Sequence, residues 1–229
     1  MKILAVDTST SLGSVALVDG PNVRGELSLN VSATHNQRLL TGIHRMLTDV
    51  GWTLQDLDGL AIGLGPGSFT GLRIGMSVMK GLAFATAKPL TGVPTLDALA
   101  ANVSLAPWGI CPVLDARKGE LYTALYQGSA TRDLERITPY LVVKPQRLVE
   151  LINERTVLLG DGLIRYGDYL AAELRDRMVR APSHLNAIHG TSIAWLAMAR
   201  LQRGLTENLA ACAPLYVRPS EAEIKRMNR

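Results

Sequence analysis

Hydrophobic and polar positions at the start of the chain follow first the period of strands and then that of a helix. Residues 3–6 form a continuous apolar run, which is typical of a strand covered on both faces. Residues 14–18 predict a second strand and residues 23–31 a third, in which alternate positions are apolar. Residues 35–50 carry apolar side chains at helical spacing. We therefore expect a three-stranded meander followed by a helix.

Strands and helices continue to alternate along the chain. A buried strand is expected over residues 60–64, then a glycine-rich turn, and then a helix over residues 70–87. A short strand over residues 90–93 and a helix over residues 95–103 follow. Strands separated by helices in this order are typical of α/β proteins.

The same alternation begins again after Pro107, which predicts two β-rich α/β lobes. We place the boundary near residues 105–107, with an N-terminal lobe over residues 1–106 and a C-terminal lobe over residues 107–229. Elements of the second lobe are expected over residues 110–114, 121–126, 137–143, 146–154, 157–160, 163–175 and 191–203. The last of these, a helix, could also pack back on the first lobe.

The composition is that of a folded protein in water. Hydrophobic residues make up 47% of the 229 residues and charged residues 19%, a balance that excludes intrinsic disorder. No apolar run approaches the roughly 18 to 20 residues that span a bilayer, and Asp7 comes too early for a signal peptide. Two cysteines are too few for a disulfide framework or a four-cysteine zinc site. We therefore expect a cytoplasmic protein that does not engage a membrane.

The net charge of +4 is unevenly distributed. Residues 1–115 hold 7 Lys and Arg against 8 Asp and Glu, whereas residues 116–229 hold 17 against 12. Eighteen of the 24 basic residues are arginines, which suit phosphate and carboxylate groups. Because no run of five or six like charges occurs, a solvated arginine-rich surface is favoured, and contact with RNA stays an open alternative.

Hydroxyl and carboxylate side chains gather between the first two expected strands. These residues are Asp7, Thr8, Ser9 and Thr10. With free backbone N–H groups they could hold a phosphate and its Mg²⁺. A hairpin turn whose side chains bond their own backbone is favoured on spacing alone. A second turn, between Asp115 and Glu120, carries Lys118 and could face a phosphate across a cleft, although a surface hairpin is favoured there too.

A glycine-rich turn leads directly into the expected helix over residues 70–87. Gly65 and Gly67 permit backbone angles that other residues avoid, and Ser68 or Thr70 can cap the helix. The free N–H groups at a helix start attract anions. The turn lacks the lysine of a Walker loop and the first glycine of a nucleophile elbow. A capped turn and an anion site both stay open.

The helix after this turn combines small and apolar residues with few charges. Its charged residues, Arg73 and Lys80, share one stripe with Ser77 and Phe84. Glycines four residues apart leave a flat strip that another helix could approach closely. We therefore favour a partner surface, which the first helix would extend into a four-helix interface. The residues expected there are Arg38, Leu39, Ile43, Met46, Arg73, Met76, Ser77, Lys80 and Phe84.

Catalytic and metal-binding patterns are sparse. The four histidines form neither an HxxxH nor an HExxH pair, which argues against a zinc hydrolase. Neither Cys111 nor Cys212 lies in a reactive sequence context, so both are expected in the core. We assign no catalytic residue and no metal ligand from the sequence.

Four segments resemble the TsaB (YeaZ) family: residues 3–10, 34–40, 65–75 and 115–122. The resemblance covers essentially the whole chain. The glycine-rich segment is the most specific of them. The resemblance implies a shortened actin-like ATPase fold (the ASKHA, RNase H-like class) with two β-rich α/β lobes. It also implies a role in making threonylcarbamoyladenosine in bacterial tRNA.

The resemblance further implies partners. These are the catalytic paralogue TsaD, the ATPase TsaE and, for the isolated chain, a second copy bound through the same helices. tRNA would be contacted only indirectly or weakly. TsaD holds its metal with an HxxxH pair, and this chain has Thr95 and Leu99 at the matching positions, neither of which replaces an imidazole. The resemblance therefore implies a non-catalytic scaffold that supports TsaD.

Two other functions stay open. A small ATPase or phosphotransferase would use Asp7 and the turn after Asp115. A glycoprotease-type endopeptidase is less favoured, because the sequence offers no ligand set for its metal. The scaffold requires no cofactor and is expected to be inactive alone, whereas the first alternative would bind ATP or ADP with Mg²⁺.

Overall fold

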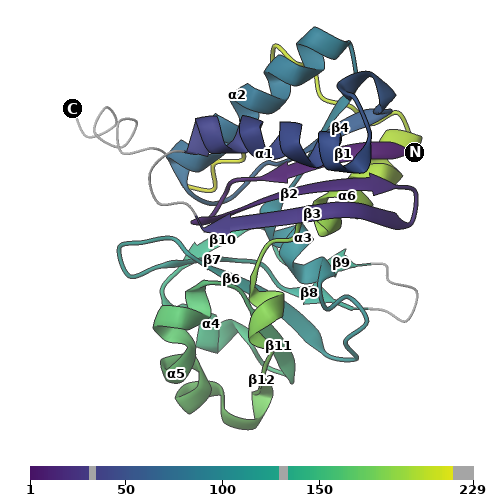
Figure 1. The fold of residues 1–229 in the computed structure, drawn as a ribbon. Coiled ribbons are helices and arrows are strands. Elements are labelled where there is room, and N and C mark those ends of the chain that lie inside the picture. Colours follow the sequence, from purple (N-terminus) through teal and green to yellow (C-terminus); the bar gives the residue numbers. More distant parts are fainter. Residues whose placement is uncertain (31–34, 129–133, 219–229) are drawn as a thin grey trace, which may run out of the picture.

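The computed structural model describes residues 1–30, 35–128 and 134–218. Its described strands form two sheets, which lie one above the other in Figure 1. The first sheet has the order β3-β2-β1-β4-β5. β2 pairs antiparallel with β1 and with β3, and β4 pairs parallel with β1 and with β5. Its strands are β1 (Lys2–Asp7), β2 (Leu12–Asp19), β3 (Asn22–Asn30), β4 (Gly59–Gly63) and β5 (Leu90–Val93).

Helices cover both faces of the first sheet, because its central strands are apolar on both sides. The helices are α1 (His35–Val50), α2 (Phe69–Thr86), α3 (Thr95–Ala101) and α6 (Gly190–Gln202). Leu4 and Val6 of β1 pack with α1 and α2, whereas Ile3 and Ala5 pack with α3 and α6. Figure 1 shows α1 and α2 on the outer side and α3 and α6 toward the second sheet.

The second sheet is built on the same plan. It has the order β10-β7-β6-β11-β12; in addition, β8 pairs with β6, and β9 pairs with β8. Its strands are β6 (Gly109–Asp115), β7 (Leu121–Thr123), β8 (Tyr126–Gln127), β9 (Glu135–Arg136), β10 (Leu141–Val143), β11 (Thr156–Leu159) and β12 (Met178–Arg180). Cys111 and Val113 of β6 pack with the outer helices, whereas Ile110 and Leu114 face the first sheet. The outer helices are α4 (Pro145–Leu151) and α5 (Gly162–Leu174), and short 3₁₀ turns are η1 (Leu54–Asp56), η2 (Arg175–Arg177) and η3 (Ser183–Asn186).

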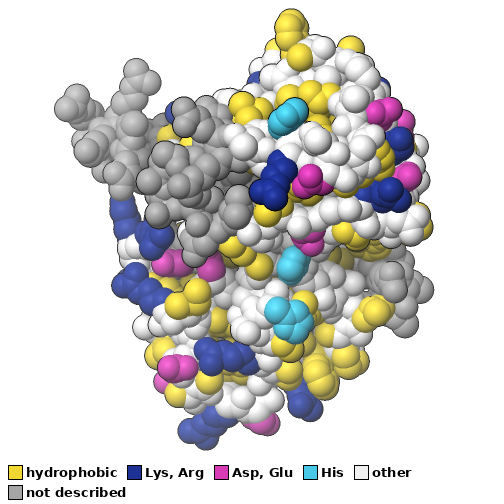
Figure 2. Space-filling view, viewed as in Figure 1, with side chains coloured by type: hydrophobic (Ala, Val, Ile, Leu, Met, Phe, Trp, Pro, Cys, Tyr) yellow, Lys and Arg dark blue, Asp and Glu magenta, His cyan; other side chains and the backbone are white. Residues whose placement is uncertain are grey.

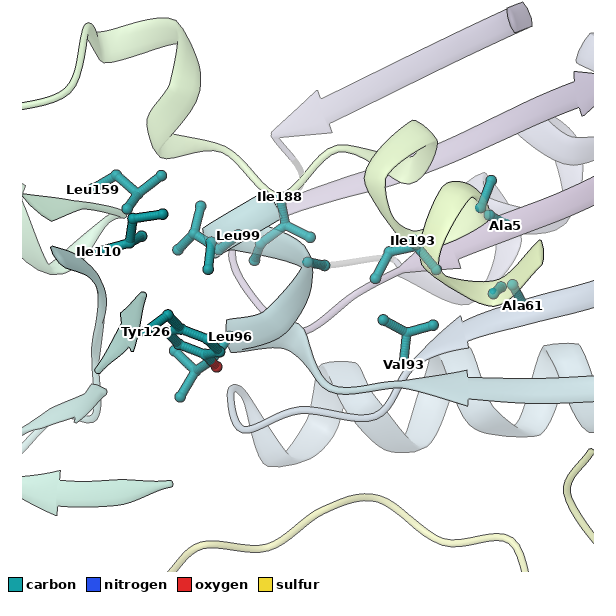
Figure 3. Close-up of a cluster of buried hydrophobic side chains, with 14 of the residues drawn as sticks. Ala5, Ala61, Val93, Leu96, Leu99, Ile110, Tyr126, Leu159, Ile188 and Ile193 are labelled. Carbon is teal, nitrogen blue, oxygen red and sulfur yellow. The ribbon is translucent and has the colours of Figure 1, made fainter. Parts of the chain in front are cut away.

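A buried cluster between the sheets joins the two lobes (Figure 3). Leu96 and Leu99 of α3 lie beside Tyr126 and Ile110 of the second sheet, while Ile193 of α6 lies on the side of the first sheet. All five side chains are at most 1% exposed. The two sheets therefore share one core through α3 and α6.

The elements of the first half lie within about two residues of their predicted ranges. The predicted end of the third strand, Val31, lies outside the described residues. Among the helices of the described chain, none combines the length and the apolar character needed to cross a membrane.

The second half departs from the prediction around β7 to β10. The strand expected over residues 121–126 is divided into β7 and β8, and that expected over residues 137–143 is reduced to β10. Between β7 and β8, the amide of Leu125 donates to the Thr138 hydroxyl (2.9 Å). A side chain that takes the place of a backbone acceptor interrupts a ladder, and the hydrophobic pattern does not reveal it. The short strands β9 and β12 were not predicted.

After α6 the chain returns along the first sheet. We call residues 205–218 the C-terminal segment. The amide of Glu207 donates to the Leu90 carbonyl (2.8 Å), and the Thr91 hydroxyl donates to the Leu205 carbonyl (2.7 Å). These bonds cover the edge of β5, which would otherwise offer unpaired backbone groups.

Polar side chains of β2 and β3 hold the start of α6. The Ser14 hydroxyl accepts a hydrogen bond from the amide of Gly190 (2.8 Å), and Glu26 Oε1 accepts one from the amide of Thr191 (3.3 Å). His189 Nδ1 lies 3.5 Å from Glu26 Oε1, and this contact raises the pKa of His189. Burial acts in the opposite direction on Glu26, but its bonds with His189 and Thr191 lower the pKa of Glu26.

We predict that Glu26→Gln destabilises the protein more at about pH 5.5 than at about pH 8.5. The ion pair is complete between the ordinary pKa values of Glu (4.5) and His (6.5). Its contribution is lost as pH rises through the raised pKa of His189, because the imidazole then becomes neutral. The free energy of unfolding in urea measures the effect. Glu173→Gln, at an exposed position on α5, is the matched control and should show no such trend.

Candidate functional site

Asp7, at the end of β1, is fully buried and turned into the first lobe. Its Oδ1 accepts hydrogen bonds from the amide (2.9 Å) and the hydroxyl (2.6 Å) of Ser9, and its Oδ2 accepts one from the Thr95 hydroxyl (3.3 Å). Burial raises the pKa of Asp7, while these bonds oppose the shift. Thr95 also accepts a hydrogen bond from the amide of Gly65 (3.0 Å). The carboxylate thus ties β1 to α3 and, through Thr95, to the glycine-rich turn.

The turn after β1 lies in backbone contact with α2, and glycines make this contact possible. A Cβ at Gly71 would collide with the Thr8 carbonyl, and one at Gly75 with the Thr8 hydroxyl. That hydroxyl donates to the Gly71 carbonyl (2.7 Å). A Cβ at Gly67 would collide with the Ser9 carbonyl. The glycine strip therefore faces a turn of its own chain, which corrects the sequence-based interpretation that it offers a flat face to a partner helix.

Ser68 is the N-cap of α2. Its hydroxyl accepts a hydrogen bond from the amide of Gly71 (3.2 Å), and its amide donates to the Ser9 carbonyl (2.6 Å). Gly65 has a φ of 101°, a backbone angle that glycine adopts without strain. Thr70, the other candidate cap, is exposed in the first turn of the helix.

A cleft of about 880 Å³ lies between the lobes. One wall is formed by the turn after β1 and the start of α2, and the other by the turn after β6 and the start of α5. Residues 215–218 of the C-terminal segment also line it. Its charged lining residues are Arg73, Arg117, Lys118, Arg165, Arg218, Asp115 and Asp161.

Three of the five residues predicted for a phosphate site reach this cleft. Ser9, Thr10 and Lys118 line it, whereas Asp7 and Thr8 do not. The two exceptions are buried, because their side chains bond to groups within the first lobe. For Asp7 and Thr8 this corrects the expectation from the sequence.

The carboxylates of the first lobe and the cleft do not fit a site for a nucleotide with Mg²⁺, which the sequence offered as an alternative at Asp7. Magnesium is held by oxygen ligands that also face the phosphates of the nucleotide, and Asp7 faces the protein interior. At the cleft, Asp115 accepts a hydrogen bond from the amide of Arg117 (2.8 Å) and pairs with its guanidinium (3.4 Å). Asp161 accepts a hydrogen bond from the amide of Asp115 (3.0 Å), and burial raises its pKa. These bonds build the turn after β6.

Thr95 and Leu99, the two positions that the resemblance matches to metal ligands of TsaD, lie on α3 and are fully buried. Thr95 bonds to Asp7 and Gly65, and Leu99 belongs to the core between the sheets (Figure 3). Within the described ranges, no group of three or more His, Cys, Asp or Glu side chains could hold a metal ion.

Four of the nine residues expected at a partner interface lie in the core of the first lobe. These are Leu39, Ile43, Met46 and Met76, each at most 8% exposed. Because they pack between α1, α2 and the sheet, they cannot supply exposed contact area, and the expected surface is corrected accordingly. The side chain of Arg38 lies outside the described residues.

The other four residues follow one exposed line along α2. Arg73 and Ser77 are exposed, Lys80 is half-buried, and Phe84 is 85% exposed. Phe69, one turn before Arg73, extends the line and is 40% exposed. We call these five residues the α2 stripe. Sequence analysis missed Phe69, although its spacing of four from Arg73 places it on the same face.

Comparison with known proteins identifies the family. The family model described as TsaD, tRNA N6-adenosine threonylcarbamoyltransferase, matches residues 29–226. The tRNA threonylcarbamoyladenosine biosynthesis protein TsaB of Escherichia coli is 32% identical over 231 residues, which cover 97% of this chain and 96% of that protein. The chain belongs to the TsaB family. A second TsaB, from Bacillus subtilis, is 36% identical over 155 residues, or 68% of this chain and 67% of that protein.

Solved structures agree with this assignment and with the predicted fold. YeaZ from Pseudomonas aeruginosa superimposes with a TM-score of 0.79 at 27% identity, covering 94% of this chain and 100% of that chain. The ethanolamine utilization protein EutJ from Carboxydothermus hydrogenoformans, at a TM-score of 0.54 and 12% identity, is similar in fold alone. This TsaB-family chain therefore has the actin-like ATPase fold with two β-rich α/β lobes, as the sequence predicts.

We predict opposite effects for two glycine substitutions in α2. Gly71→Ala should lower the free energy of unfolding by about 1–3 kcal/mol, because the added methyl group meets the Thr8 backbone. Gly81→Ala, in the same helix with open space around it, should raise it by about 0.5–1 kcal/mol. Urea unfolding of the two variants measures both values. Equal effects would contradict the close approach of the turn to α2.

Proposed function

We propose that this chain is a non-catalytic subunit of the tRNA threonylcarbamoyladenosine modification complex, which binds and supports a TsaD-like catalytic paralogue. The α2 stripe is the surface through which it binds. The observation that carries this proposal is the 85% exposure of Phe84 on a helix whose opposite side is fixed to its own lobe. Supported in this way, the paralogue would be held in a competent conformation for the adenosine next to the anticodon.

The α2 stripe has the properties of a binding surface. Phe69 and Phe84 lie fifteen residues apart, or about 22 Å along the helix. Between them, Arg73 and Ser77 are exposed and Lys80 is half-buried. Exposed aromatic side chains and arginine are the residues that most often carry interface energy. The core side chains of α1 and α2 beneath the stripe make it rigid, so little ordering is needed on binding.

The same stripe would serve a second copy of the chain when the paralogue is absent, and a TsaE-like ATPase would join the complex of the two proteins. tRNA would be contacted mainly through the paralogue. On the face shown in Figure 2, Lys and Arg side chains are distributed over both lobes with Asp and Glu side chains among them, which supports indirect contact. This role takes place in the cytoplasm and needs no cofactor on this chain.

We predict that Ser77→Arg weakens binding to the paralogue by about 3 kcal/mol or more, because it places an unpaired charge in a desolvated contact. Titration calorimetry with the purified paralogue measures the affinity. Ala172→Arg, at an exposed position on α5, is the matched control and should bind as the wild type does. Wild-type affinity of Ser77→Arg would show that the interface lies elsewhere.

Asp7→Asn separates the scaffold from the ATPase alternative. Asparagine keeps an oxygen that accepts the bonds from Ser9, and the residue lies beneath the surface. We therefore expect unchanged affinity for the paralogue and no ATP hydrolysis by the wild-type or the variant chain alone. ATP turnover by the wild type that the substitution abolishes would instead favour the ATPase.

A further inference from the structure

The C-terminal segment crosses from the first lobe to the second along the cleft. It leaves the edge of β5 and follows α2, where the Lys80 ammonium donates to the Cys212 carbonyl (3.2 Å). The buried Cys212 sulfur lies 3.5 Å from the sulfur of Met76 in the core. The amide of Leu215 then donates to the Leu64 carbonyl (2.8 Å). The segment is therefore fixed to the first lobe as far as residue 215.

Beyond this point the segment contacts the α2 stripe a second time, at the start of the helix. The ring of Tyr216 lies 5.3 Å from that of Phe69, and the Tyr216 hydroxyl accepts a hydrogen bond from Arg73 Nε (3.2 Å). The Arg73 guanidinium also lies over the Phe69 ring, 3.9 Å from its centre. Phe69 and Tyr216 are 40% and 39% exposed. Phe69 and Arg73, which both also face solvent, therefore hold the end of the segment, as Lys80 holds it at Cys212.

The last described residue of the segment binds the second lobe. Arg218 Nη1 donates to the Ala116 carbonyl (3.2 Å), and its guanidinium pairs with the Glu120 carboxylate. The turn between these two residues is closed by a bond from the Ala116 amide to the Glu120 carbonyl (3.0 Å). It also carries Arg117 and Lys118, which line the cleft. Holding Ala116 and Glu120 therefore holds one wall of the cleft.

We propose that the C-terminal segment couples the α2 stripe to the cleft. In the isolated chain, Tyr216 and Arg218 link α2 to the turn after β6 and so hold the two walls of the cleft together. A partner on the stripe contacts the same Phe69 and Arg73 side chains that hold Tyr216. The segment can exist in two states, one with Tyr216 bound to the stripe and one with Tyr216 released. A partner shifts the equilibrium between them when it binds one state better than the other. The released state leaves the Phe69 and Arg73 side chains free for the partner.

The link between the lobes is tested on the protein alone by hydrogen exchange. Arg218→Ala should speed exchange at the amides of Leu215, Ala116 and Glu120 about tenfold, because these amides open when the segment is released. Glu120→Gln should act in the same direction. Arg203→Ala, an exposed arginine just after α6, is the matched control. Unchanged exchange at Ala116 and Glu120 in both test variants, with the strands of the first sheet still protected, would overturn the link.

The coupling, which rests on the proposed function, is tested by adding the TsaD-like paralogue. In the wild type, its binding should speed exchange at Ala116 and Glu120. Tyr216→Phe keeps the ring beside Phe69 but lacks the hydroxyl that Arg73 holds, so the paralogue should bind it with a smaller change in exchange. Binding to the wild type without any change overturns the coupling and leaves the proposed function standing. Absence of binding overturns both, while the exchange of the isolated variants still decides the link.

Discussion

The contact between the turn after β1 and the glycine face of α2 determines the arrangement of the first lobe. Only a helix without Cβ atoms on that face can lie against the Thr8 and Ser9 backbone. The contact brings Ser68 to the Ser9 carbonyl and turns Asp7 inward to Ser9 and Thr95. With its glycine face inward, α2 must present the opposite face to solvent. The exposure of the α2 stripe is thus a geometric consequence of where the glycines lie.

The hydrophobic periodicity of the sequence predicts much of the fold, but it predicts less of the candidate functional site. The apolar runs of β1 and β4 and the helical spacing of α1 locate these elements, because burial on given faces selects the residues there. The glycine spacing indicated a close approach but not its partner, since a turn of the same chain and a foreign helix need the same bare surface. Helical spacing likewise does not show which element covers an apolar face. Met46 and Met76 were therefore predicted at a partner interface, although both are buried in the core of the first lobe. The C-terminal segment has no periodicity, and its backbone bonds leave no sequence signal.

Two buried residues of α3 mark a difference between this chain and its catalytic paralogue. Thr95 and Leu99 stand where the resemblance places metal ligands in TsaD. In this chain Thr95 joins Asp7 to the glycine-rich turn, and Leu99 packs between the two sheets. Both positions therefore contribute to folding, and a histidine at either would leave a polar ring in an apolar or fully bonded site. Restoring a metal centre would require rebuilding the core around it.

The placement of α6 has a consequence for synthesis on the ribosome. This helix covers the inner face of the first sheet, yet it is synthesised about 100 residues after the last strand of that sheet. Until it emerges, α3 is the one helix of the described chain available to cover Ile3, Ala5 and Ala61 on that side, and the edge of β5 stays open until the C-terminal segment follows. The first half of the chain therefore leaves the ribosome as an unfinished lobe with an apolar face. Chaperones that bind such faces would meet it while the roughly 100 residues between β5 and α6 are translated.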